Sequence, residues 1–531
     1  MSELRNITLG ELFSEVCTRF ENRIAVEYLG DETTYAQLDA LTDRIARGML
    51  ALGIKKGSRA AIWGNDRPNT LYCLLAMAKI GAVAVMLGTS LQKSELEGLM
   101  SLAEAEYIFF DEGFRDTSFP EICGKLEVKG LKERCYIGVE PVEGFMDIEE
   151  LADMSGKVSL HELAAAKAEV KPEDNDMIIF TSGTTSASKG VLTTHFSRAN
   201  NVLAHIEALR VTENDKFCVA IPMFHCFSLT GSVLSAIMSG ACVYFPANRR
   251  TKTLFEAIEQ DKITVLHAVP TLFSAMLARN NAGEYDISSL RTGVIGGATY
   301  PPEFFERISR ELDYNLMSSL GQTEATAGFT FCDYDDPMEI KANTVGRFIE
   351  HTEGMIRNIV TNEPQPIGEI GEICVRGYGV MQSYVNAPEV TAETLQADGW
   401  LRTGDMGFID ENNCLHITGR LKDMIIRGGE NISPVEIEDL IRADERTADV
   451  KAVAVPDEHY GEEICACIVL REGAEMSEDE ARELVKAKLA YFKVPRYVIF
   501  VDAIPKTGSG KVAIGQLKEK AKTALGLRGA M

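Results

Sequence analysis

Phe180-Thr-Ser-Gly-Thr-Thr-Ser-Ala-Ser-Lys189-Gly190 is a hydroxyl- and glycine-rich stretch that directly follows an apolar run at residues 177–180. The run predicts a buried strand, and the polar stretch predicts a loop at its carboxyl end. The hydroxyls and backbone N–H groups of such a loop can surround phosphate oxygens, and Lys189 adds a point charge. In a Walker A loop the lysine follows the second glycine, whereas Lys189 precedes Gly190, which argues against an ordinary P-loop kinase. A serine-rich surface loop is the alternative interpretation.

The chain around this loop alternates amphipathic helices with short apolar runs. A helix is predicted at residues 35–53, after Thr33-Thr34 and before a stop at Gly53, and a second helix at residues 71–80. Strands are predicted at residues 60–63, 83–87, 177–180, 217–221, 241–245, 265–269 and 294–295. This alternation predicts an α/β fold, in which ligands gather at the carboxyl ends of the strands.

Length and composition indicate a large enzyme with more than one domain. The 531 residues exceed what one hydrophobic core usually serves. Beyond Arg420, two apolar runs, a helix capped by Ser477 and Glu480, and a last apolar run at residues 497–501 predict a small C-terminal domain. The expected architecture is a large multi-sheet N-terminal domain at residues 1–420 and a small α+β domain at residues 421–531.

Charge and cysteine usage restrict partners and location. The net charge of -25 disfavours nucleic acid and anionic membrane surfaces as partners. Twelve scattered cysteines without CxxC spacing predict reduced thiols, and the N-terminus lacks a signal-peptide pattern, so a cytoplasmic location is expected. Residues 72–91 are apolar, but Lys79, Gly81 and Gly88 interrupt them, which favours a buried helix and strand over a membrane span.

Three later segments complete a pattern of motifs. They are Ser319-Leu-Gly-Gln-Thr-Glu324, Gly399-Trp-Leu-Arg-Thr-Gly-Asp405 with Gly419-Arg420, and Pro505-Lys-Thr-Gly-Ser-Gly-Lys511. With residues 180–190, and in this order and spacing, they resemble the AMP-forming acyl-CoA synthetases, a superfamily that includes luciferases and peptide-synthetase adenylation domains. The resemblance covers essentially the whole chain.

The resemblance implies ATP and Mg²⁺ as cofactors, with coenzyme A and a small carboxylic acid as partners. It places ATP or AMP on residues of all four segments and of a Gly-Gly-Ala stretch: Thr181, Ser182, Gly183, Thr184, Thr185, Lys189, Gly297, Ala298, Ser319, Leu320, Gly321, Thr323, Asp405, Arg420 and Lys511. It also places magnesium on Glu324 and Thr184, whose oxygens are hard ligands of the kind that Mg²⁺ prefers. An ionised Asp405 accepts hydrogen bonds, which suits the ribose hydroxyls.

The same resemblance implies a mobile C-terminal domain. Lys511 is expected to stabilise charge as the substrate carboxylate attacks the α-phosphate, so that Lys511, Glu324 and Thr184 are the predicted catalytic residues. Lys422 maps onto the hinge about which the domain then swings, bringing up the pantetheine-lining residues Gly428, Gly429 and Glu430. A solvated lysine near the C-terminus is the alternative for Lys511.

Two segments are expected to bound the acyl site, namely residues 222–228 and 296–298. His225, Phe227 and Gly296 are the predicted contacts, because aromatic residues supply an apolar wall and small residues leave space. For His225 a role as a satisfied core residue is an equal alternative. The sequence departs from the family at Leu320, where an aromatic residue is usual, and at Ser186 and Ser188, where glycine and proline are usual.

The predicted function is ligation of an aliphatic acid, fatty or betaine-type, to coenzyme A. Similarity of Ser186 and of residues 424–433 to fatty-acyl and crotonobetaine/carnitine-type ligases supports the aliphatic class. The alternatives are an aryl-acid CoA ligase, an adenylation enzyme that loads a carrier protein, and a luciferase-like oxygenase. A non-catalytic nucleotide-binding scaffold is disfavoured, because it would not need Lys189, Glu324, Asp405, Arg420 and Lys511 together. The oligomeric state is left open, a homodimer included.

Overall fold

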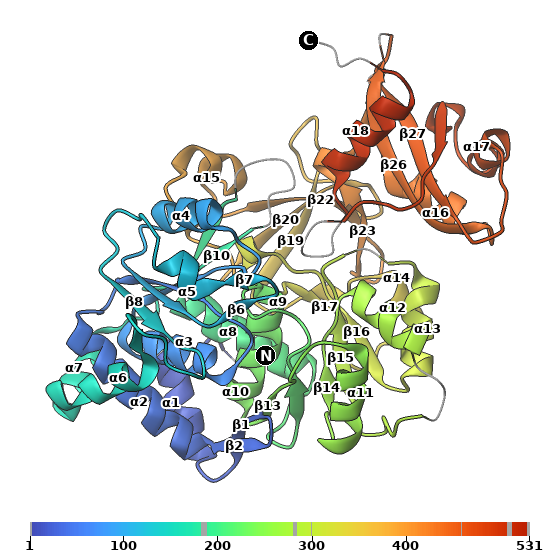
Figure 1. Ribbon diagram of the computed structural model, residues 1–531. Coiled ribbons are helices and arrows are strands. Elements are labelled where there is room, and N and C mark those ends of the chain that lie inside the picture. Colours follow the sequence, from blue (N-terminus) through green and yellow to red (C-terminus); the bar gives the residue numbers. More distant parts are fainter. Residues whose placement is uncertain are drawn as a thin grey trace. The chain divides into compact units, whose positions relative to one another are not determined.

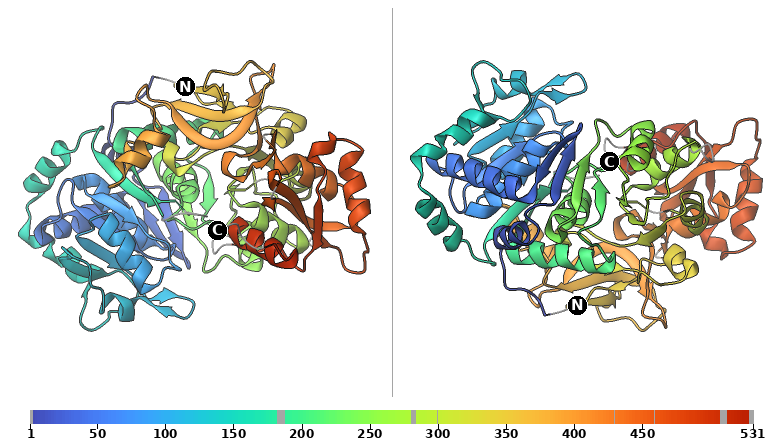
Figure 2. Two further views of the ribbon diagram at one scale, coloured as in Figure 1. Left: turned by 90° about the horizontal axis from the view of Figure 1, so that it is seen from above. Right: turned by 90° about the horizontal axis from the view of Figure 1, so that it is seen from below.

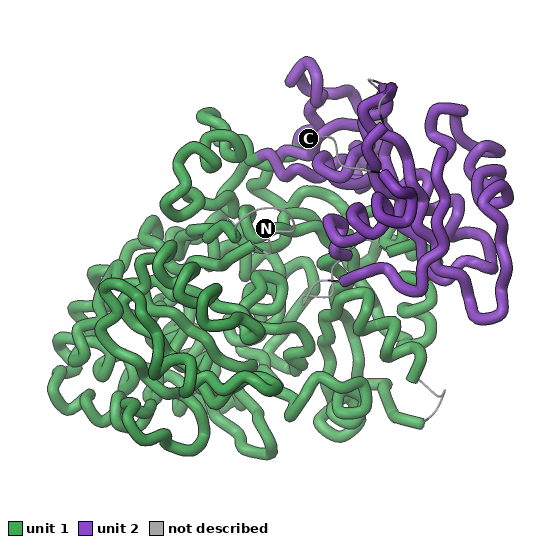
Figure 3. Tube along the Cα trace, turned by 45° about the horizontal axis from the view of Figure 1, so that its top comes forward, with its two compact units in different colours: residues 1–181, 188–354, 375–401 green, residues 182–187, 355–374, 402–531 purple. Residues whose placement is uncertain are grey.

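The computed structural model describes residues 3–181, 188–279, 284–298, 300–428, 430–457, 459–506 and 512–527. The chain forms two compact units, which are coloured separately in Figure 3. Unit 1 comprises residues 1–181, 188–354 and 375–401, and unit 2 comprises residues 182–187, 355–374 and 402–531. The functional division into residues 1–420 and 421–531 rests on the sequence and stays a prediction.

An eight-stranded sheet in unit 1 contains the predicted strand before residue 180. Its order is β21 (Ser383–Tyr384), β11 (Gly190–Thr194), β10 (Asn175–Phe180), β4 (Val83–Met86), β3 (Arg59–Trp63), β5 (Tyr107–Phe110), β8 (Glu133–Tyr136) and β9 (Met146–Asp147). Strands β10, β4, β3, β5 and β8 run parallel, whereas β11 returns antiparallel to β10. The carboxyl ends of the parallel strands therefore meet at one edge of the sheet.

A seven-stranded sheet in unit 1 joins distant parts of the sequence. Its order is β16 (Asn315–Ser318), β15 (Thr292–Ile295), β14 (Val265–Leu266), β12 (Lys216–Cys218), β13 (Cys242–Phe245), β1 (Ile24–Tyr28) and β2 (Asp31–Thr34). The blue strand β1 lies beside the green strand β13 in Figure 1, and Val26 pairs with Val243. Strands β12 and β14 end earlier than predicted: Ala220 N–H turns back to bond the Cys218 carbonyl, and Pro270 begins the next helix.

Helices occupy three layers around the two sheets. Between the sheets lie α1 (Leu9–Arg19), α2 (Tyr35–Leu52), α3 (Pro68–Ile80), α8 (His195–Ala208) and α10 (Ser235–Ser239), whose buried side chains share one core with inward residues of both sheets. The outer faces are covered by α4 (Lys93–Leu102) and α5 (Phe119–Cys123) on one sheet, and by α11 (Thr251–Gln260), α12 (Pro270–Arg279) and α13 (Pro302–Glu311) on the other. Figure 2 shows from two further sides that the blue N-terminal segments lie against the green segments of unit 1.

Alternation along the strands explains this layering. In β3, Ala60 and Ile62 face the shared core, whereas Ala61 and Trp63 face α4 and α5. Successive side chains of a strand point to opposite faces, so a strand covered on both faces carries apolar residues on both, as residues 60–63 of β3 do. The apolar stretch at residues 72–91 is the buried helix α3 followed by β4, as predicted.

Local signals explain where the predicted helices begin and end. Thr34 and Gln37 form a capping box at the start of α2, and Gly53 ends the helix with a φ of 93°, a left-handed conformation that costs glycine little. Ser477 and Glu480 form the predicted capping box of α17 (Glu478–Lys486) in unit 2. Both helices therefore satisfy their first free N–H groups within a few residues.

The remaining described elements of unit 1 are short. They are β6 (Gly113–Phe114), β7 (Thr117–Ser118), α6 (Ile148–Asp153), α7 (Leu160–Glu169), α9 (Cys226–Ser228), a π-helix at Leu229–Leu234, β17 (Thr330–Phe331), α14 (Met338–Asn343), β18 (Arg347–Phe348) and α15 (Pro388–Thr394). Turns of 3-10 helix occur at Met154–Lys157 and Thr323–Ala325.

Two sheets build unit 2. The first, mainly in this unit, has the order β19 (Thr352–Arg357), β20 (Gly371–Gly377), β22 (Leu401–Ile409) and β23 (Leu415–Arg420). The second contains β25 (Glu430–Ile432), β24 (Ile425–Arg427), β27 (Gly461–Leu470) and β26 (Thr447–Asp457), with β28 (Tyr497–Phe500) parallel to β27. Helices α16 (Pro434–Arg442), α17 and α18 (Ile514–Ala524) accompany it, so the predicted α+β character of this part is confirmed.

Cysteine burial is nearly complete. All twelve cysteines lie in the described residues as free thiols; eleven are buried, and Cys226 is half-buried. Burial raises the pKa of Cys17 to about 12, and burial likewise raises the pKa of Cys73 well above its usual range. A membrane-spanning helix is not found among the described residues, because none is both long and apolar enough.

Candidate functional site

The ends of the predicted phosphate-binding loop are held by a β-hairpin. Strands β10 and β11 pair from Asn175 and Thr194 to Phe180 and Gly190, and the Thr181 N–H donates to the Lys189 carbonyl at 3.0 Å. A Cβ on Gly190 would lie 3.0 Å from Ile178 and 3.1 Å from Phe180, which is tighter than most side chains tolerate. The hairpin therefore fixes both ends of the loop at the edge of the eight-stranded sheet.

Part of the predicted site lies outside the described residues. This applies to Ser182, Gly183, Thr184, Thr185 and Ser186 of the loop, and to Gly429 and Lys511 in unit 2. The residues that flank Lys511 are described: Lys506 pairs with Val512, and the Ala513 N–H donates to the Pro505 carbonyl at 2.8 Å. The roles of these residues stay predictions.

Glu324 lies in a tight turn after β16. The turn begins at the predicted nucleotide contacts Ser319 and Leu320, whose chain follows directly from the strand. A Cβ on Gly321 would approach the Ala327 carbonyl oxygen to 2.4 Å, so the turn requires glycine at this position. Thr323 and Glu324 then form the 3-10 turn, and Thr326 follows with a φ of 70°. A β-branched residue at positive φ is strained, and such strain persists only where the surroundings impose it.

A buried arginine network surrounds the strained residue. The Arg198 guanidinium donates to the Asp176 carboxylate at 2.9 Å, to the Thr193 and Thr230 hydroxyls at 2.8 and 2.7 Å, and to the Thr326 carbonyl at 3.2 Å. The Thr326 hydroxyl donates to the Gly379 carbonyl at 2.6 Å. Asp176 and Thr193 belong to the hairpin strands, so Arg198 ties the hairpin to the turn that carries Glu324.

Tyr384 connects the two ends of the predicted phosphate and metal site. Its hydroxyl donates to Glu324 Oε1 at 2.8 Å, and Lys189 Nζ lies 4.8 Å from the centre of its ring. Burial, followed by the Glu324 charge, raises the pKa of Tyr384 well above its usual range, so its hydroxyl remains a donor. Strand β21 pairs Tyr384 with Val191, and the Met381 N–H donates to the Glu324 carbonyl at 2.8 Å. Lys189 and Glu324, distant in sequence, therefore meet at one tyrosine.

The segment at residues 222–228 lies next to the Glu324 turn. Cys226 Sγ is 3.6 Å from the Thr323 hydroxyl oxygen. The Asp66 carboxylate accepts from the Met223 N–H at 2.7 Å and pairs with Arg249 at 2.7 Å, which anchors the start of the segment. The segment that carries His225 and Phe227 and the turn that carries Glu324 are thus neighbours within unit 1.

Phe227 and Gly296, two of the predicted acyl contacts, lie against each other. A Cβ on Gly296 would lie 3.5 Å from two carbons of the Phe227 ring, so the glycine leaves that face of the ring open. The ring of His267 is nearly parallel to Phe227, with the centroids 5.8 Å apart. Burial lowers the pKa of His267 to about 3, which keeps it neutral behind this wall. In the same segment, the ring centroids of Phe224 and His225 are 4.4 Å apart.

Gly297 and Ala298 are exposed at the carboxyl end of β15. Gly297 has a φ of 85°, and a Cβ there would lie 3.4 Å from Val269. The chain can therefore turn at this edge without covering it with side chains. The two residues lie where ligands bind in open α/β sheets.

Asp405 and Arg420 lie opposite each other on paired strands of unit 2. Arg420 Nε is 3.0 Å from Asp405 Oδ1, and Asp405 is buried while the Arg420 side chain is 49% exposed. The Asp405 N–H donates to the Thr403 hydroxyl at 3.1 Å. The carboxylate is thus held in place beside an accessible guanidinium, a combination that suits the hydroxyls and phosphate of a nucleotide.

The predicted hinge and CoA residues follow in unit 2. Lys422 lies in a 3-10 turn at Leu421–Asp423, directly after β23. Gly428 has a φ of 58°, and a Cβ there would lie 2.9 Å from the Tyr460 ring. Arg427 lies over the same ring at 4.8 Å and pairs with Glu463 at 2.8 Å, while Glu430 is exposed at the start of β25. The glycine therefore allows the backbone to pass close to an aromatic face.

Glu324 fits the role of a magnesium ligand. Its carboxylate is half-buried, and only Oε1 accepts the Tyr384 hydroxyl, which leaves acceptor capacity for a cation. Mg²⁺ is usually held by one or two carboxylates together with substrate phosphates and water. Among the described residues, no group of three or more His, Cys, Asp or Glu is arranged to hold a metal ion.

Sequence reasoning missed three residues that hold this site together, namely Tyr384, Arg198 and Asp66. A signal exists for Arg198: the buried residues of α8 include His195, Arg198, Asn201 and His205, a polar stripe at helical spacing that marks an internal network. Tyr384 contacts Glu324, 60 positions away, and no local sequence pattern predicts this contact. No local sequence pattern marks Asp66 either.

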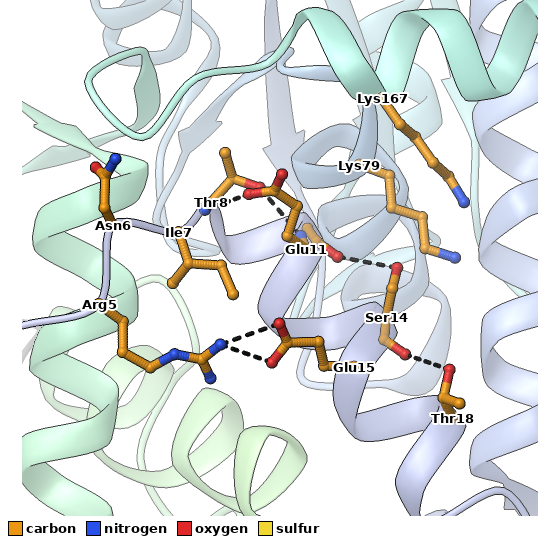
Figure 4. Close-up of a pocket in the computed structure, with 11 residues that line it drawn as sticks. Arg5, Asn6, Ile7, Thr8, Glu11, Ser14, Glu15, Thr18, Lys79 and Lys167 are labelled. Atoms are coloured by element: carbon orange, nitrogen blue, oxygen red, sulfur yellow. Dashed lines mark hydrogen bonds and ion pairs between the residues drawn. The ribbon is translucent and has the colours of Figure 1, made fainter.

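A separate cavity of about 730 Å³ lies beside α1 and is drawn in Figure 4. Its charged residues are paired with protein groups: Arg5 with Glu15, Lys79 with Asp39 and Asp43, and Lys167 with Asp43. Glu11 accepts from the Thr8 N–H as part of the α1 capping box. None of the predicted site residues lines this cavity.

The phosphate-loop hairpin, the carboxylate turn and the neighbouring aromatic segment on a two-sheet α/β scaffold define the class of adenylate-forming enzymes. The chain belongs to the AMP-binding enzyme family: the family model for "AMP-binding enzyme" matches residues 13–385, and that for "AMP-binding enzyme C-terminal domain" matches residues 436–511. Three predictions are thereby confirmed: membership of this superfamily, the α/β fold and the class of enzyme.

The similarity to relatives and to solved structures extends over nearly the whole chain. A protein named as an acyl-CoA synthetase, YngI of Bacillus subtilis (strain 168), is 36% identical over 541 residues, covering 98% of both chains. The mitochondrial medium-chain acyl-CoA ligase ACSF2 of Rattus norvegicus is 34% identical, covering 99% of this chain and 89% of the relative. The ATP-bound structure of MatB from Rhodopseudomonas palustris has a TM-score of 0.86 at 27% identity, covering 98% of this chain and 100% of that one. A Mycobacterium tuberculosis fatty acyl CoA synthetase has a TM-score of 0.77 at 28% identity, covering 97% and 99%.

Proposed function

We propose that this chain is an ATP-dependent carboxylic acid–CoA ligase that acts in two steps on a medium-chain aliphatic acid. In the first step a carboxylate oxygen of the acid bonds to the α-phosphorus of ATP, the bond to the leaving oxygen breaks, and pyrophosphate departs from the acyl-adenylate. In the second step the CoA sulfur bonds to the acyl carbon, the thiol proton is lost, and AMP leaves with the electrons of the broken anhydride bond.

The observation that carries this proposal is the meeting of Lys189 and Glu324 at Tyr384. A loop rich in hydroxyls and backbone N–H groups, with a lysine at its end, suits a polyphosphate. A carboxylate beside that loop suits the cation that accompanies such a phosphate. Because Cys226 contacts Thr323 on the same turn, an acid bound along residues 222–228 has its carboxylate close to these groups.

The first step assigns each group a task. The loop and Lys189 hold the β- and γ-phosphates, and Asp405 with Arg420 holds the ribose and the AMP phosphate. Mg²⁺ held by Glu324 and Thr184 neutralises phosphate charge when it is bound. Lys511 donates hydrogen bonds to the oxygens on which charge develops, and a positioned ammonium of this kind stabilises the transition state more than the ground state.

The second step requires a thiol to reach the acyl carbon. A turn about Lys422 withdraws Lys511 and brings up Gly428, Gly429 and Glu430, whose two glycines admit the thin pantetheine arm. The backbone at Gly428 packs so closely on the Tyr460 ring that a side chain at residue 428 would displace the ring, which supports a requirement for glycine at this position.

An aliphatic acid fits the apolar wall made by Phe227 with Gly296. Ligand pockets are lined mainly by apolar and aromatic groups, with few polar groups that fix orientation. The medium-chain preference is taken from the named activity of the ACSF2 relatives. A cytoplasmic location, for which the twelve free thiols argue, and a homodimer remain predictions.

The test is pyrophosphate release from ATP with acetate, medium-chain, long-chain, aryl and betaine-type acids, each with and without CoA. The proposal expects the strongest turnover with medium-chain acids and formation of AMP and acyl-CoA only when CoA is present. Adenylate that accumulates and is never passed to CoA would favour carrier-protein loading. Absence of pyrophosphate release with every acid would refute a ligase.

A Lys511→Ala variant tests the mechanism of the first step. Loss of one preorganised donor is expected to slow adenylate formation about 100- to 1,000-fold. ATP should still bind, since the loop, Asp405 and Arg420 are intact. Lys506→Ala, which removes an exposed lysine from the described start of the same sequence motif, is the matched control. Equal rates for the two variants would remove Lys511 from the mechanism.

A further inference from the structure

We propose that Tyr384 is a positioning residue that sets the Glu324 carboxylate for the metal ion and holds Lys189 toward the nucleotide phosphates. The inference deepens the proposed function, because it rests on the assignment of Glu324 and Lys189 to the metal and phosphate site. It concerns a residue that none of the sequence motifs includes.

Three contacts carry the inference. The Tyr384 hydroxyl donates to Glu324 Oε1 at 2.8 Å, and its ring lies under the Lys189 ammonium at 4.8 Å. The Met381 N–H donates to the Glu324 carbonyl, which fixes the backbone of the same residue. Tyr384 itself is only 4% exposed, so its orientation is imposed by packing and not by solvent.

The backbone around Tyr384 is tied to the phosphate loop as well. Tyr384 pairs with Val191, the Val385 N–H donates to the Gly190 carbonyl at 2.8 Å, and the Gln382 N–H donates to the Leu192 carbonyl at 2.9 Å. Strand β21 thus extends the hairpin that ends the loop. One short strand therefore joins the strand that ends the loop to the segment that holds Glu324.

The physical consequence concerns orientation of both groups. A hydrogen bond to one carboxylate oxygen directs the remaining lone pairs of Glu324 toward a cation, and loss of such an outer partner typically costs 10- to 100-fold in metal affinity or activity. The aromatic ring attracts the ammonium of Lys189 and restricts its many rotamers. Tyr384 therefore organises two binding groups without touching the substrate.

The experiment compares Tyr384→Phe and Tyr384→Leu with the wild type. Tyr384→Phe keeps the ring under Lys189 and removes only the hydroxyl, whereas Tyr384→Leu removes both interactions. Tyr378→Phe is the matched control, because in the described part of the chain the buried Tyr378 hydroxyl has no hydrogen-bond partner. Binding of Mn²⁺ is titrated by its electron paramagnetic resonance signal in the presence of ATP, and binding of ATP alone is measured calorimetrically.

We expect Tyr384→Phe to weaken Mn²⁺ binding with ATP about 10- to 100-fold, with ATP binding in the absence of metal and the unfolding temperature unchanged. Tyr384→Leu should weaken metal-free ATP binding by about threefold in addition. Excess Mg²⁺ should restore pyrophosphate release by Tyr384→Phe.

Two results would overturn the inference. One is a Tyr384→Phe titration that superimposes on those of the wild type and Tyr378→Phe. The other is loss of all binding together with a lowered unfolding temperature, which would make Tyr384 a purely structural residue. Because the metal titration needs no acid, it tests Tyr384 even if the wild type releases no pyrophosphate, an outcome that would refute the proposed function separately.

Discussion

Replacement of Arg198 by Met should strongly destabilise unit 1, because it leaves a carboxylate buried without its cation. The side chains of Arg198 and Asp176 are each 1% exposed and are joined at 2.9 Å. Removal of one partner of a buried ion pair typically costs about 3–5 kcal/mol, since the remaining charge is neither solvated nor paired. Met has a similar length and no charge, so the change mainly deletes the electrostatic and hydrogen-bonding contribution.

The chain offers a selective probe for this measurement. It contains two tryptophans, Trp63 and Trp400, and both belong to unit 1. Tryptophan fluorescence during urea unfolding therefore reports unit 1 without a signal from unit 2. The midpoint and slope for Arg198→Met, compared with the wild type, give the change in the free energy of unfolding.

A double mutant separates the charge from the packing. In Asp176→Asn with Arg198→Met, no charge of this pair remains buried, so the double mutant should be more stable than Arg198→Met alone by about 2 kcal/mol. A double mutant that is as unstable as the sum of the single changes would refute the reasoning. A cost below about 1 kcal/mol for Arg198→Met would do the same.

Three further changes test other parts of the structure. Lys422→Pro should impair thioester formation more than adenylate formation, because it restricts the hinge and leaves the adenylation residues in place; equal loss in assays of the two half-reactions would contradict a hinge. Gly296→Leu should lower kcat/KM for the longest accepted acids about tenfold or more relative to short ones, because the added side chain starts 3.5 Å from the Phe227 ring and fills the space beyond it. Burial lowers the pKa of His205 to about 4 and that of His267 to about 3, below their value of about 6.5 in an unfolded chain. The contribution of the two neutral imidazoles to the free energy of unfolding is therefore complete above pH 6.5 and is lost as the pH falls toward the folded-state pKa values. Urea unfolding between pH 6.5 and 4 should therefore give a steeper acid dependence for the wild type than for His205→Leu, by about 1.4 kcal/mol per pH unit, and parallel profiles would contradict the assignment.

Local chemistry made much of the fold predictable. The cap at its start and Gly53 at its end made the helix at residues 35–53 predictable, and Ser477 with Glu480 marks the start of α17. Alternation of helices and apolar runs indicates the α/β class, because a strand covered on both faces must be apolar along its length. These signals lie within a few residues of the structure that they determine.

The parts that could not be predicted depend on long-range contacts. Strands β12 and β14 end before the predicted apolar runs do, since the chain turns where apolar side chains still continue into the core. Tyr384 and Arg198 act on the Glu324 turn from 60 and 128 residues away, measured to Glu324 and Thr326 respectively. No periodicity encodes such pairs, because tertiary packing alone brings them together.

The burial of the cysteines has a consequence for a protein that handles activated acyl groups. An acyl-adenylate acylates thiolates, and only a thiol that is both accessible and able to ionise can intercept it. Eleven of the twelve thiols, all within the described residues, are buried, and burial raises the pKa of Cys73 and Cys135, among others, far above neutral pH. Among the cysteines, only Cys226 is more than slightly exposed, so the thiol of CoA meets little competition from the protein's own thiols.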